Sequence, residues 1–274
     1  MAHTLGILGG DRRFQLLAAH FQEAGRPVLT AALGLPDDRD PLSLAASCDI
    51  LVLPLPLTRE GKTLHAPLAT APVPLSEDLA AALAGKTLLG GGLFSLAKAP
   101  PAWQALSFTD YSADEAFLQG NAVLTARTAL PELLLHTPGG LPGAEVLLLG
   151  WGRIARALAP LLESLGASVT CVARRPEARL AIARAGFAPA DFSIARPFHA
   201  LINTVPAPAV GEALLSRQSP ETLLLELASA PGGFDRSAAA ALGLPIHDAP
   251  GLPGKRAPRA AARLLYSTLE RMIP

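Results

Sequence analysis

The chain has 274 residues, half of them apolar and 17% charged, with 23 basic and 23 acidic side chains. This composition provides apolar material for one large α/β domain or two ordinary ones, and it excludes intrinsic disorder. The formal net charge of zero favours neither nucleic acid nor an anionic membrane surface as a partner.

The apolar runs are shorter than the roughly 20 residues that a membrane-spanning helix needs. The N-terminus has the pattern of a first strand and not of a signal peptide, so we expect a cytoplasmic protein. Two cysteines, Cys48 and Cys171, make neither a disulfide framework nor a metal cluster, and no metal site is expected. Cys171 lies in a strand pattern and is predicted to be a buried, inert thiol.

Short apolar strands alternate with helices rich in alanine and leucine, which is the pattern of parallel βαβ units. In the first half we predict strands at residues 3–8, 28–32, 49–53, 87–90 and 106–108, and helices at 12–24, 113–120 and 122–136. Pro131 is expected to kink or break the last of these helices.

Residues 137–143 are the densest Pro/Gly stretch before a new strand, which is typical of a domain boundary. After them we predict strands at 145–149, 168–173, 200–203, 222–227 and 245–247, helices at 153–165 and 176–185, a Pro/Gly-rich loop and a final helix at 257–271.

The predicted fold class is α/β, with two open α/β domains that contain parallel sheets. We assign residues 1–121 to a substrate-binding and catalytic domain, and residues 122–256 to a Rossmann dinucleotide-binding domain. The C-terminal helix, within residues 257–274, is expected to return to the first domain.

The sequence Gly150-Trp151-Gly152-Arg153-Ile154-Ala155 follows a predicted strand and opens a predicted helix. Its first glycine permits a tight turn, its second lets the backbone approach a pyrophosphate, and Ala155 lets helix and strand pack closely. The helix N-terminus offers free N–H groups to the phosphates. This context indicates dinucleotide binding, and a purely structural turn is the alternative.

The next strand ends in Ala173-Arg174-Arg175, without the Asp or Glu that usually holds the ribose 2′-hydroxyl of NAD. Guanidinium groups pair bidentately with phosphate, so the predicted cofactor is NADP. The alternative is that one or both arginines only solvate a loop.

Several separated motifs carry a resemblance over nearly the whole length of the chain. They are Gly9-Gly10-Asp11-x-Arg13, Leu53-Pro54-Leu55-Pro56-Leu57-Thr58-Arg59-Glu60-Gly61, Gly150-x-Gly152-Arg153, Ile202-Asn203-Thr204-Val205-Pro206, Leu227-Ala228-Ser229-x-Pro231-Gly232-Gly233 and Ala249-Pro250-Gly251-Leu252-Pro253-Gly254. In these motifs the chain resembles the A subunit of dipicolinate synthase, an NADP-dependent enzyme of spore formation.

The resemblance implies an oxidoreductase that dehydrates and oxidises 4-hydroxy-tetrahydrodipicolinate to dipicolinate while a hydride passes to NADP. The implied partners are a small dicarboxylate substrate and a flavoprotein-like B subunit. We also expect a homo-oligomer, in the cytoplasm of the mother cell of a sporulating bacterium.

Arg13 and Arg59 follow strand ends and are the candidate substrate-binding residues, because a dicarboxylate needs cationic forks. Asp11 is a candidate catalytic residue that could orient Arg13 or shuttle a proton, or could merely cap the first helix. His65 is the preferred candidate base. The other histidines considered for this role are His20, His136 and His247. The candidate cofactor-binding residues are Gly150, Trp151, Gly152, Arg153, Ile154, Ala173, Arg174, Arg175, Asn203, Thr204, Val205, Pro206, Leu227, Ala228, Gly251 and Pro253.

Three positions depart from the family pattern. Arg127 stands where the family has Glu, Arg259-Ala260 where it has Lys-Thr, and Glu226 where it usually has Asp. Two other functions stay open, and the change at Arg127 supports the second of them. One is another two-domain NADP-dependent dehydrogenase, of the shikimate or methylene-tetrahydrofolate type. The other is an NADP-binding subunit of low activity that regulates or scaffolds a partner.

Overall fold

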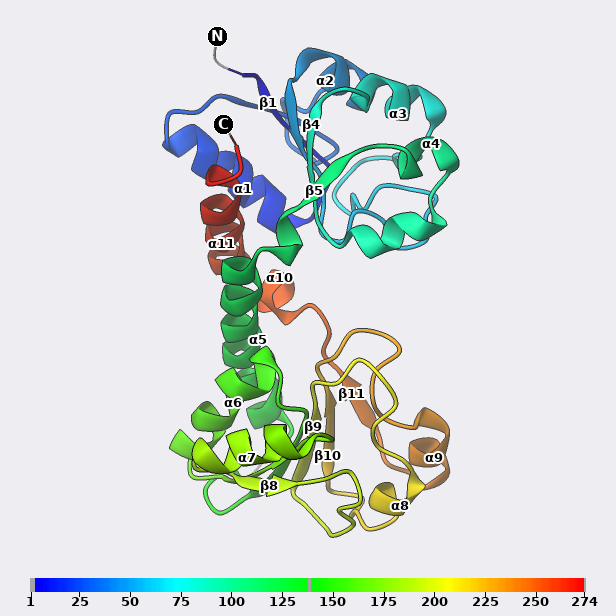
Figure 1. The fold of residues 1–274 in the computed structure, drawn as a ribbon. Coiled ribbons are helices and arrows are strands. Elements are labelled where there is room, and N and C mark those ends of the chain that lie inside the picture. The colour runs from blue at the N-terminus through cyan, green and yellow to red at the C-terminus, as the bar shows by residue number, and fades with distance from the viewer. Residues whose placement is uncertain (1–2, 138, 274) are drawn as a thin grey trace. The chain divides into compact units, whose positions relative to one another are not determined.

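The computed structural model describes residues 3–137 and 139–273, and the chain divides into two compact units (Figure 1). The first unit comprises Met1–Asn121 with Ala257–Pro274, and the second comprises Ala122–Arg256. Within the described ranges, no helix is both long enough and apolar enough to cross a membrane.

The first unit holds a five-stranded parallel sheet in the order β2-β1-β3-β4-β5. Its strands are β1 (Leu5–Leu8), β2 (Val28–Ala31), β3 (Ile50–Val52), β4 (Thr87–Gly90) and β5 (Phe108–Asp110). Its helices are α1 (Arg12–Glu23), α2 (Pro41–Ser47), α3 (Glu77–Leu83), α4 (Pro101–Gln104) and α11 (Pro258–Glu270), with 3-10 turns η1 (Leu93–Lys98) and η2 (Tyr111–Ala113).

Alternate residues of these strands pack on opposite faces of the sheet, as the two-residue period of a strand requires. Leu51 joins a core with α2 and α3, whereas Ile50 and Val52 join a core with α1 and α11. Helices α1 and α11 lie side by side (Figure 1), so the predicted return of the C-terminal helix to the first domain is confirmed.

The second unit holds a six-stranded parallel sheet in the order β11-β10-β9-β6-β7-β8. Its strands are β6 (Glu145–Leu149), β7 (Ser168–Val172), β8 (Ala188–Ala190), β9 (Ala200–Asn203), β10 (Leu223–Glu226) and β11 (Ile246–Asp248). Its helices are α6 (Arg153–Ser164), α7 (Pro176–Arg184), α8 (Glu212–Leu215), α9 (Arg236–Ala241) and α10 (Leu252–Arg256). Renumbered along this unit, the strand order is the 3-2-1-4-5-6 of dinucleotide-binding domains, and the predicted fold class is confirmed.

Helix α5 (Glu115–Leu135) corrects the prediction of two helices, because it is continuous from Glu115 to Leu135 and is not broken at Pro131. A proline removes one backbone hydrogen bond from a helix. Here that loss is offset because Ala126, Ala129 and Leu133 are buried in the core of the second unit.

The Pro/Gly stretch at residues 137–143, which has the composition of a domain boundary, does not separate the two units. The division falls between Asn121 and Ala122, inside α5, and the Pro/Gly stretch belongs to the second unit. Leu141 and Ala144 are buried in the same core as the second half of α5, so this stretch is part of the domain and not a linker. Pro138 lies outside the described residues.

Candidate active site

The first group of predicted site residues lies at the carboxyl ends of β1 and β3. In the order β2-β1-β3, the strand that follows β1 in the chain lies on one side of β1, and β3 lies on the other side. The strand order therefore reverses between β1 and β3, which makes their carboxyl ends a topological switch point. Ligands of open parallel sheets bind at such points, outside the carboxyl ends of the strands.

Asp11 is the N-cap of α1, and its Oδ1 accepts a hydrogen bond from the backbone N–H of Arg13. The same carboxylate accepts from Nε and Nη2 of Arg13 at 2.9 and 2.8 Å, and Nη2 also donates to the carbonyl of Leu55 at 2.8 Å. Burial of Asp11 raises its pKa, but the hydrogen bond and charge of Arg13 outweigh burial and hold the pKa below its usual value of 3.8. Asp11 is therefore an ionised residue that orients Arg13 as well as capping the helix.

Arg59 and His65 lie in the long loop after β3. Nε of Arg59 donates to Nδ1 of His65 at 3.2 Å, and the backbone N–H of Gly10 donates to the carbonyl of His65 at 2.9 Å. Burial and then the charge of Arg59 lower the pKa of His65 below 6.5, against the opposing charge of Asp11. The structure thus brings Asp11, Arg13, Arg59 and His65 into one cluster.

Thr58 is a buried residue in this loop whose role the sequence did not reveal. Its Oγ1 donates to the carbonyl of Thr63 at 2.6 Å and accepts from the N–H of Gly61 at 3.0 Å. These two bonds close the turn that carries Arg59. A threonine beside an arginine is too common a pattern to signal this role.

The remaining candidate histidines lie elsewhere. His20 is on α1, beside Glu23 and the ring of Tyr266. In the second unit His136 and His247 stack with their ring centroids 3.9 Å apart. None of these contacts involves the cluster after β1 and β3.

The second group of predicted site residues lies at the carboxyl edge of the sheet of the second unit. Gly150 follows β6 with φ of +99°, and a Cβ there would lie 2.7 Å from Oγ1 of Thr204 and 2.9 Å from the side chain of Val205. Oγ1 of Thr204 donates to the carbonyl of Leu149 at 2.7 Å and so joins β9 to β6. The glycine turn therefore lies at the switch point between β6 and β9.

Gly152 is the N-cap of α6, with φ of −82°, and a Cβ added there would meet no atom within 4 Å among the described residues other than its two chain neighbours. The space beside its backbone is open at the N-terminus of a 12-residue helix. Such a place accepts phosphate through backbone N–H groups and the helix dipole. Trp151 beside it contacts the ring of Phe187, with Arg156 over its face.

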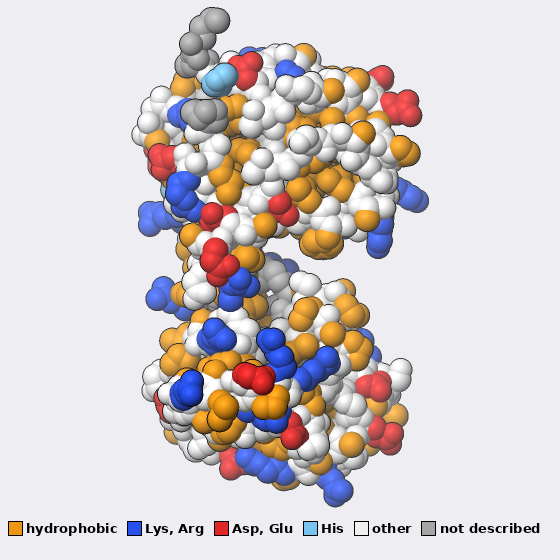
Figure 2. All heavy atoms as spheres, in the orientation of Figure 1, with side chains coloured by type: hydrophobic (Ala, Val, Ile, Leu, Met, Phe, Trp, Pro, Cys, Tyr) orange, Lys and Arg blue, Asp and Glu red, His pale blue; other side chains and the backbone are white. Residues whose placement is uncertain are grey.

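Arg174 and Arg175 are exposed just after β7, the strand next to β6. Arg174 donates to the carbonyl of Pro208 at 3.2 Å and lies over the ring of Phe192, which holds its position. Figure 2 shows basic side chains gathered over the region of α6 and α7. Arg174 and Arg175 lie at the edge of the sheet where the sequence predicts a binding site for the 2′-phosphate of NADP.

The other predicted cofactor residues follow β9, β10 and β11 at the same edge. Thr204, Val205 and Pro206 follow β9, whereas the side chain of Asn203 is fully buried. Leu227 and Ala228 follow β10 and are nearly buried. Gly251 precedes α10, and Pro253 lies within it; the short helix α10 replaces part of the loop that we predicted there.

Other residues raised by the sequence lie outside both groups. Arg127 is exposed on α5 in the second unit, and Arg259 is exposed on α11 in the first. Cys171 is buried as predicted, and burial raises the pKa of its thiol to about 12.

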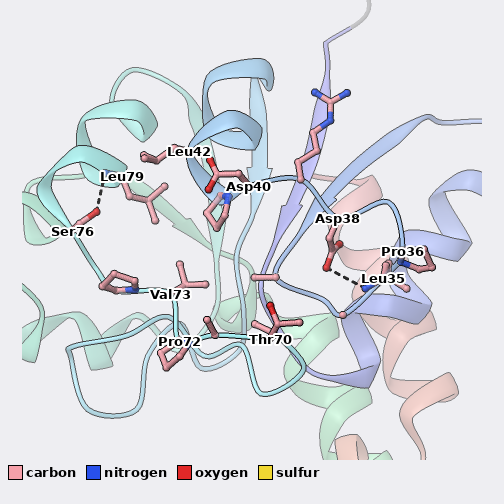
Figure 3. Close-up of a pocket in the computed structure, with 17 residues that line it drawn as sticks. Leu35, Pro36, Asp38, Asp40, Leu42, Thr70, Pro72, Val73, Ser76 and Leu79 are labelled. Carbon is pink, nitrogen blue, oxygen red and sulfur yellow. Dashed lines mark hydrogen bonds between the residues drawn. The ribbon is translucent and has the colours of Figure 1, made fainter.

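A cavity of about 790 Å³ lies in the first unit at the carboxyl end of β2, between residues 32–42 and 69–79 (Figure 3). No predicted site residue lines it. Oδ2 of Asp38 accepts from the N–H groups of Leu33 and Leu35, and among the described residues Oδ1 has no hydrogen-bond partner.

Residues 4–97 match the family described as the N-terminal domain of the dipicolinate synthase A subunit. The dipicolinate synthase A subunit of Bacillus subtilis (strain 168) is 32% identical over 157 residues. That alignment covers 56% of this chain and 53% of the relative, about half the length of each.

Solved structures resemble the fold of the whole chain. The dipicolinate synthase A subunit of Bacillus halodurans has a TM-score of 0.85 at 24% identity, and the alignment covers 99% of this chain and 97% of that structure. A transhydrogenase of Sinorhizobium meliloti has a TM-score of 0.62 at 15% identity, covering 98% of this chain and 94% of its own. The D-lactate dehydrogenase of Escherichia coli has a TM-score of 0.60 at 11% identity, and the alignment covers 98% of this chain and 95% of that structure.

The match of residues 4–97 covers the motifs that the sequence carries after β1 and β3. The resemblance predicted from the sequence is confirmed: residues 4–97 match the N-terminal domain of the dipicolinate synthase A subunit, and about half of the chain is similar to the A subunit of B. subtilis.

Proposed function

We propose that this protein is an NADP-dependent oxidoreductase that converts 4-hydroxy-tetrahydrodipicolinate to dipicolinate. The observation that carries the proposal is the Gly150–Gly152 turn, which opens α6 at the switch point of a dinucleotide-binding sheet, in a chain whose first unit matches the N-terminal domain of the dipicolinate synthase A subunit. The relatives with dehydrogenase names share this fold, and the family name supplies the product.

The open backbone of Gly152 and the N-terminus of α6 fit the pyrophosphate of a dinucleotide. Arg174 and Arg175 fit a 2′-phosphate, because a guanidinium meets phosphate oxygens with two parallel N–H groups. A carboxylate at the end of β7 would instead select the free 2′-hydroxyl of NAD. These residues therefore favour NADP, which when bound supplies the hydride acceptor.

The reaction balances as one dehydration and one two-electron oxidation. The C4 hydroxyl leaves with a ring proton as water, and a new ring double bond forms. A hydride and a proton then leave the ring. The products are dipicolinate, NADPH, one proton and one water.

In this proposal Arg13 and Arg59 bind the two carboxylates of the substrate. Asp11 uses the Nε–Nη2 edge of Arg13 and the carbonyl of Leu55 takes the other N–H of Nη2, so a substrate carboxylate meets Nη1 of that guanidinium. When Arg59 turns to a substrate carboxylate, it releases Nδ1 of His65, and the neutral imidazole can then take a ring proton. Asp11 keeps Arg13 aligned and stays ionised throughout.

The B. subtilis relative is named as one subunit of its enzyme, and by analogy we propose that this chain works with a flavoprotein-like B subunit. Assembly as a homo-oligomer and a role in the mother cell of a sporulating bacterium belong to the same proposal.

The test is to supply purified protein with NADP⁺ and 4-hydroxy-tetrahydrodipicolinate, both alone and with a dipicolinate synthase B subunit. We expect NADPH and dipicolinate in equal amounts, and slower turnover with NAD⁺. Absence of both products in both mixtures would contradict the proposed function and favour a protein without turnover of its own.

A further inference from the structure

A buried carboxylate joins two loops at the carboxyl edge of the second sheet. Glu226, the last residue of β10, is 2% exposed. Its Oε1 accepts from Nδ2 of Asn203 at 2.7 Å and from the N–H of Ala228 at 3.0 Å, and its Oε2 accepts from the N–H of Gly233 at 2.7 Å. Both ends of the loop after β10 are thus tied to one side chain.

Asn203 extends this network to the loop after β9. Its Nδ2 also donates to the carbonyl of Val205 at 2.8 Å, and its Oδ1 accepts from the N–H of Val205 at 3.1 Å. With its side chain fully buried, Asn203 contributes through these bonds and not by touching a ligand. Glu226 and Asn203 together fix the backbone of two neighbouring loops.

The packing around the pair leaves little freedom. A Cβ on Gly233 would lie 2.4 Å from Nδ2 of Asn203, which requires that side chain to move. Burying a carboxylate is costly unless its oxygens are hydrogen-bonded, whereas a fully satisfied buried network makes its surroundings rigid. The arrangement therefore functions to hold the loops and not merely to fill the core.

The two loops belong to one half of the dinucleotide site. In a sheet of this order, β6 to β8 form one mononucleotide-binding half and β9 to β11 form the other. Arg174 follows β7 in the first half, and the 2′-phosphate that we assign to it belongs to the adenosine of NADP. The loops after β9 and β10 lie in the other half, which we assign to the nicotinamide.

We propose that Glu226 is a positioning residue that sets the backbone of both loops for the nicotinamide half of the dinucleotide. This inference rests on the proposed function. It predicts that loss of the carboxylate weakens binding of the whole dinucleotide without affecting recognition of its adenosine end.

Glu226→Gln tests the inference. Three N–H groups point at the two oxygens, so an amide NH₂ in place of either oxygen faces another donor and releases at least one loop contact. We expect affinity for NADPH to fall about tenfold, while affinity for adenosine 2′,5′-bisphosphate stays unchanged. Glu145→Gln, which removes an exposed carboxylate from β6 in the same sheet, is the matched control and should leave both affinities unchanged.

Equal weakening toward both ligands would indicate a general structural role, and no weakening toward either would also overturn the inference. Hydrogen exchange gives a readout that needs no ligand. The amides of Ala228 and Gly233 should exchange faster in Glu226→Gln while those of β6 do not. Gly233→Ala, which disturbs Asn203 from the other side, should produce the same pattern if Glu226→Gln folds poorly.

If wild type binds no dinucleotide, the proposed function fails and the exchange experiment still decides whether Glu226 holds the loops. If wild type binds NADPH and the exchange of these amides is unchanged in both variants, the role of Glu226 fails alone.

Discussion

Arg59 donates from Nε to Nδ1 of His65 over 3.2 Å, which places the proton of the neutral imidazole on Nε2. Burial and the charge of Arg59 favour this neutral form, because both lower the pKa of His65. The nitrogen that could act as a base is therefore held by the cation that we assign to the substrate. In the proposed function, this hydrogen bond couples the binding of substrate by Arg59 to the release of Nδ1 of His65.

A pH profile tests that coupling. His65 must be neutral to act as a base, so kcat/KM should fall on the acid side with a midpoint below 6.5, the usual value for histidine. His65→Gln should lower kcat about 100-fold and remove this acid limb. His20→Gln, which changes a histidine on α1 that contacts Tyr266, should leave the profile as in wild type. An unchanged acid limb in His65→Gln would exclude His65 as the titrating base.

The ion pair of Asp11 and Arg13 should contribute to stability as well as to substrate binding. The folded-state pKa of Asp11 is lowered from 3.8, so its contribution is present above that pH and is lost as the pH falls through the folded-state pKa. At neutral pH, Asp11→Asn should cost about 1–3 kcal/mol and raise the KM for the substrate, because Arg13 loses its orientation.

Asp40→Asn is the matched control for that change. Asp40 is likewise the N-cap of a helix, α2, and accepts from the N–H of Ser43. Asparagine caps helices about as well as aspartate, so this variant should be nearly neutral. Denaturant unfolding at neutral and at acid pH measures the free energy of unfolding of both variants. Equal effects of the two substitutions would mean that Asp11 acts as a cap alone.

The choice of cofactor should depend on the arginines after β7. Replacing Arg174 and Arg175 together by alanine should raise the KM for NADP about 10- to 100-fold, because a 2′-phosphate would lose its cationic partners. The KM for NAD should change little. Arg184→Ala, at the exposed end of α7, is the control for loss of an exposed arginine away from the end of β7. A parallel loss for NAD and NADP would show that the pair does not read the 2′-phosphate.

Local patterns predicted much of the second sheet. The bounds of β6 and β9 were predicted as observed, because apolar strands next to glycine or polar turns have clear ends. The glycine turn was recognised because the strand before it and the helix after it agree with the motif. The continuity of α5 was missed because its second half is stabilised by core contacts that a local reading of Pro131 does not include.

Two short helices had signals that we did not use. Asp40 before Pro41 marks the start of α2, and Ser76 before two acidic residues marks the start of α3. By contrast, the hydrogen bond between Asn203 and Glu226 joins residues that are far apart in the sequence. Glu226 and Asn203 are 23 positions apart, and nothing in the local sequence of either indicates their hydrogen bond.

Binding of NADPH to Gly152→Ala, measured by calorimetry beside wild type and Gly211→Ala, tests the central claim most directly. Gly152 and Gly211 are both helix N-caps with negative φ, and a Cβ at either would meet no atom within 4 Å among the described residues other than its two chain neighbours. Both variants should therefore fold like wild type. We predict that Gly152→Ala loses about tenfold or more in affinity, because its methyl group occupies the space where the pyrophosphate approaches the backbone, and that Gly211→Ala binds as wild type does. Equal binding by all three proteins, or no binding by wild type, would contradict a dinucleotide site at this turn.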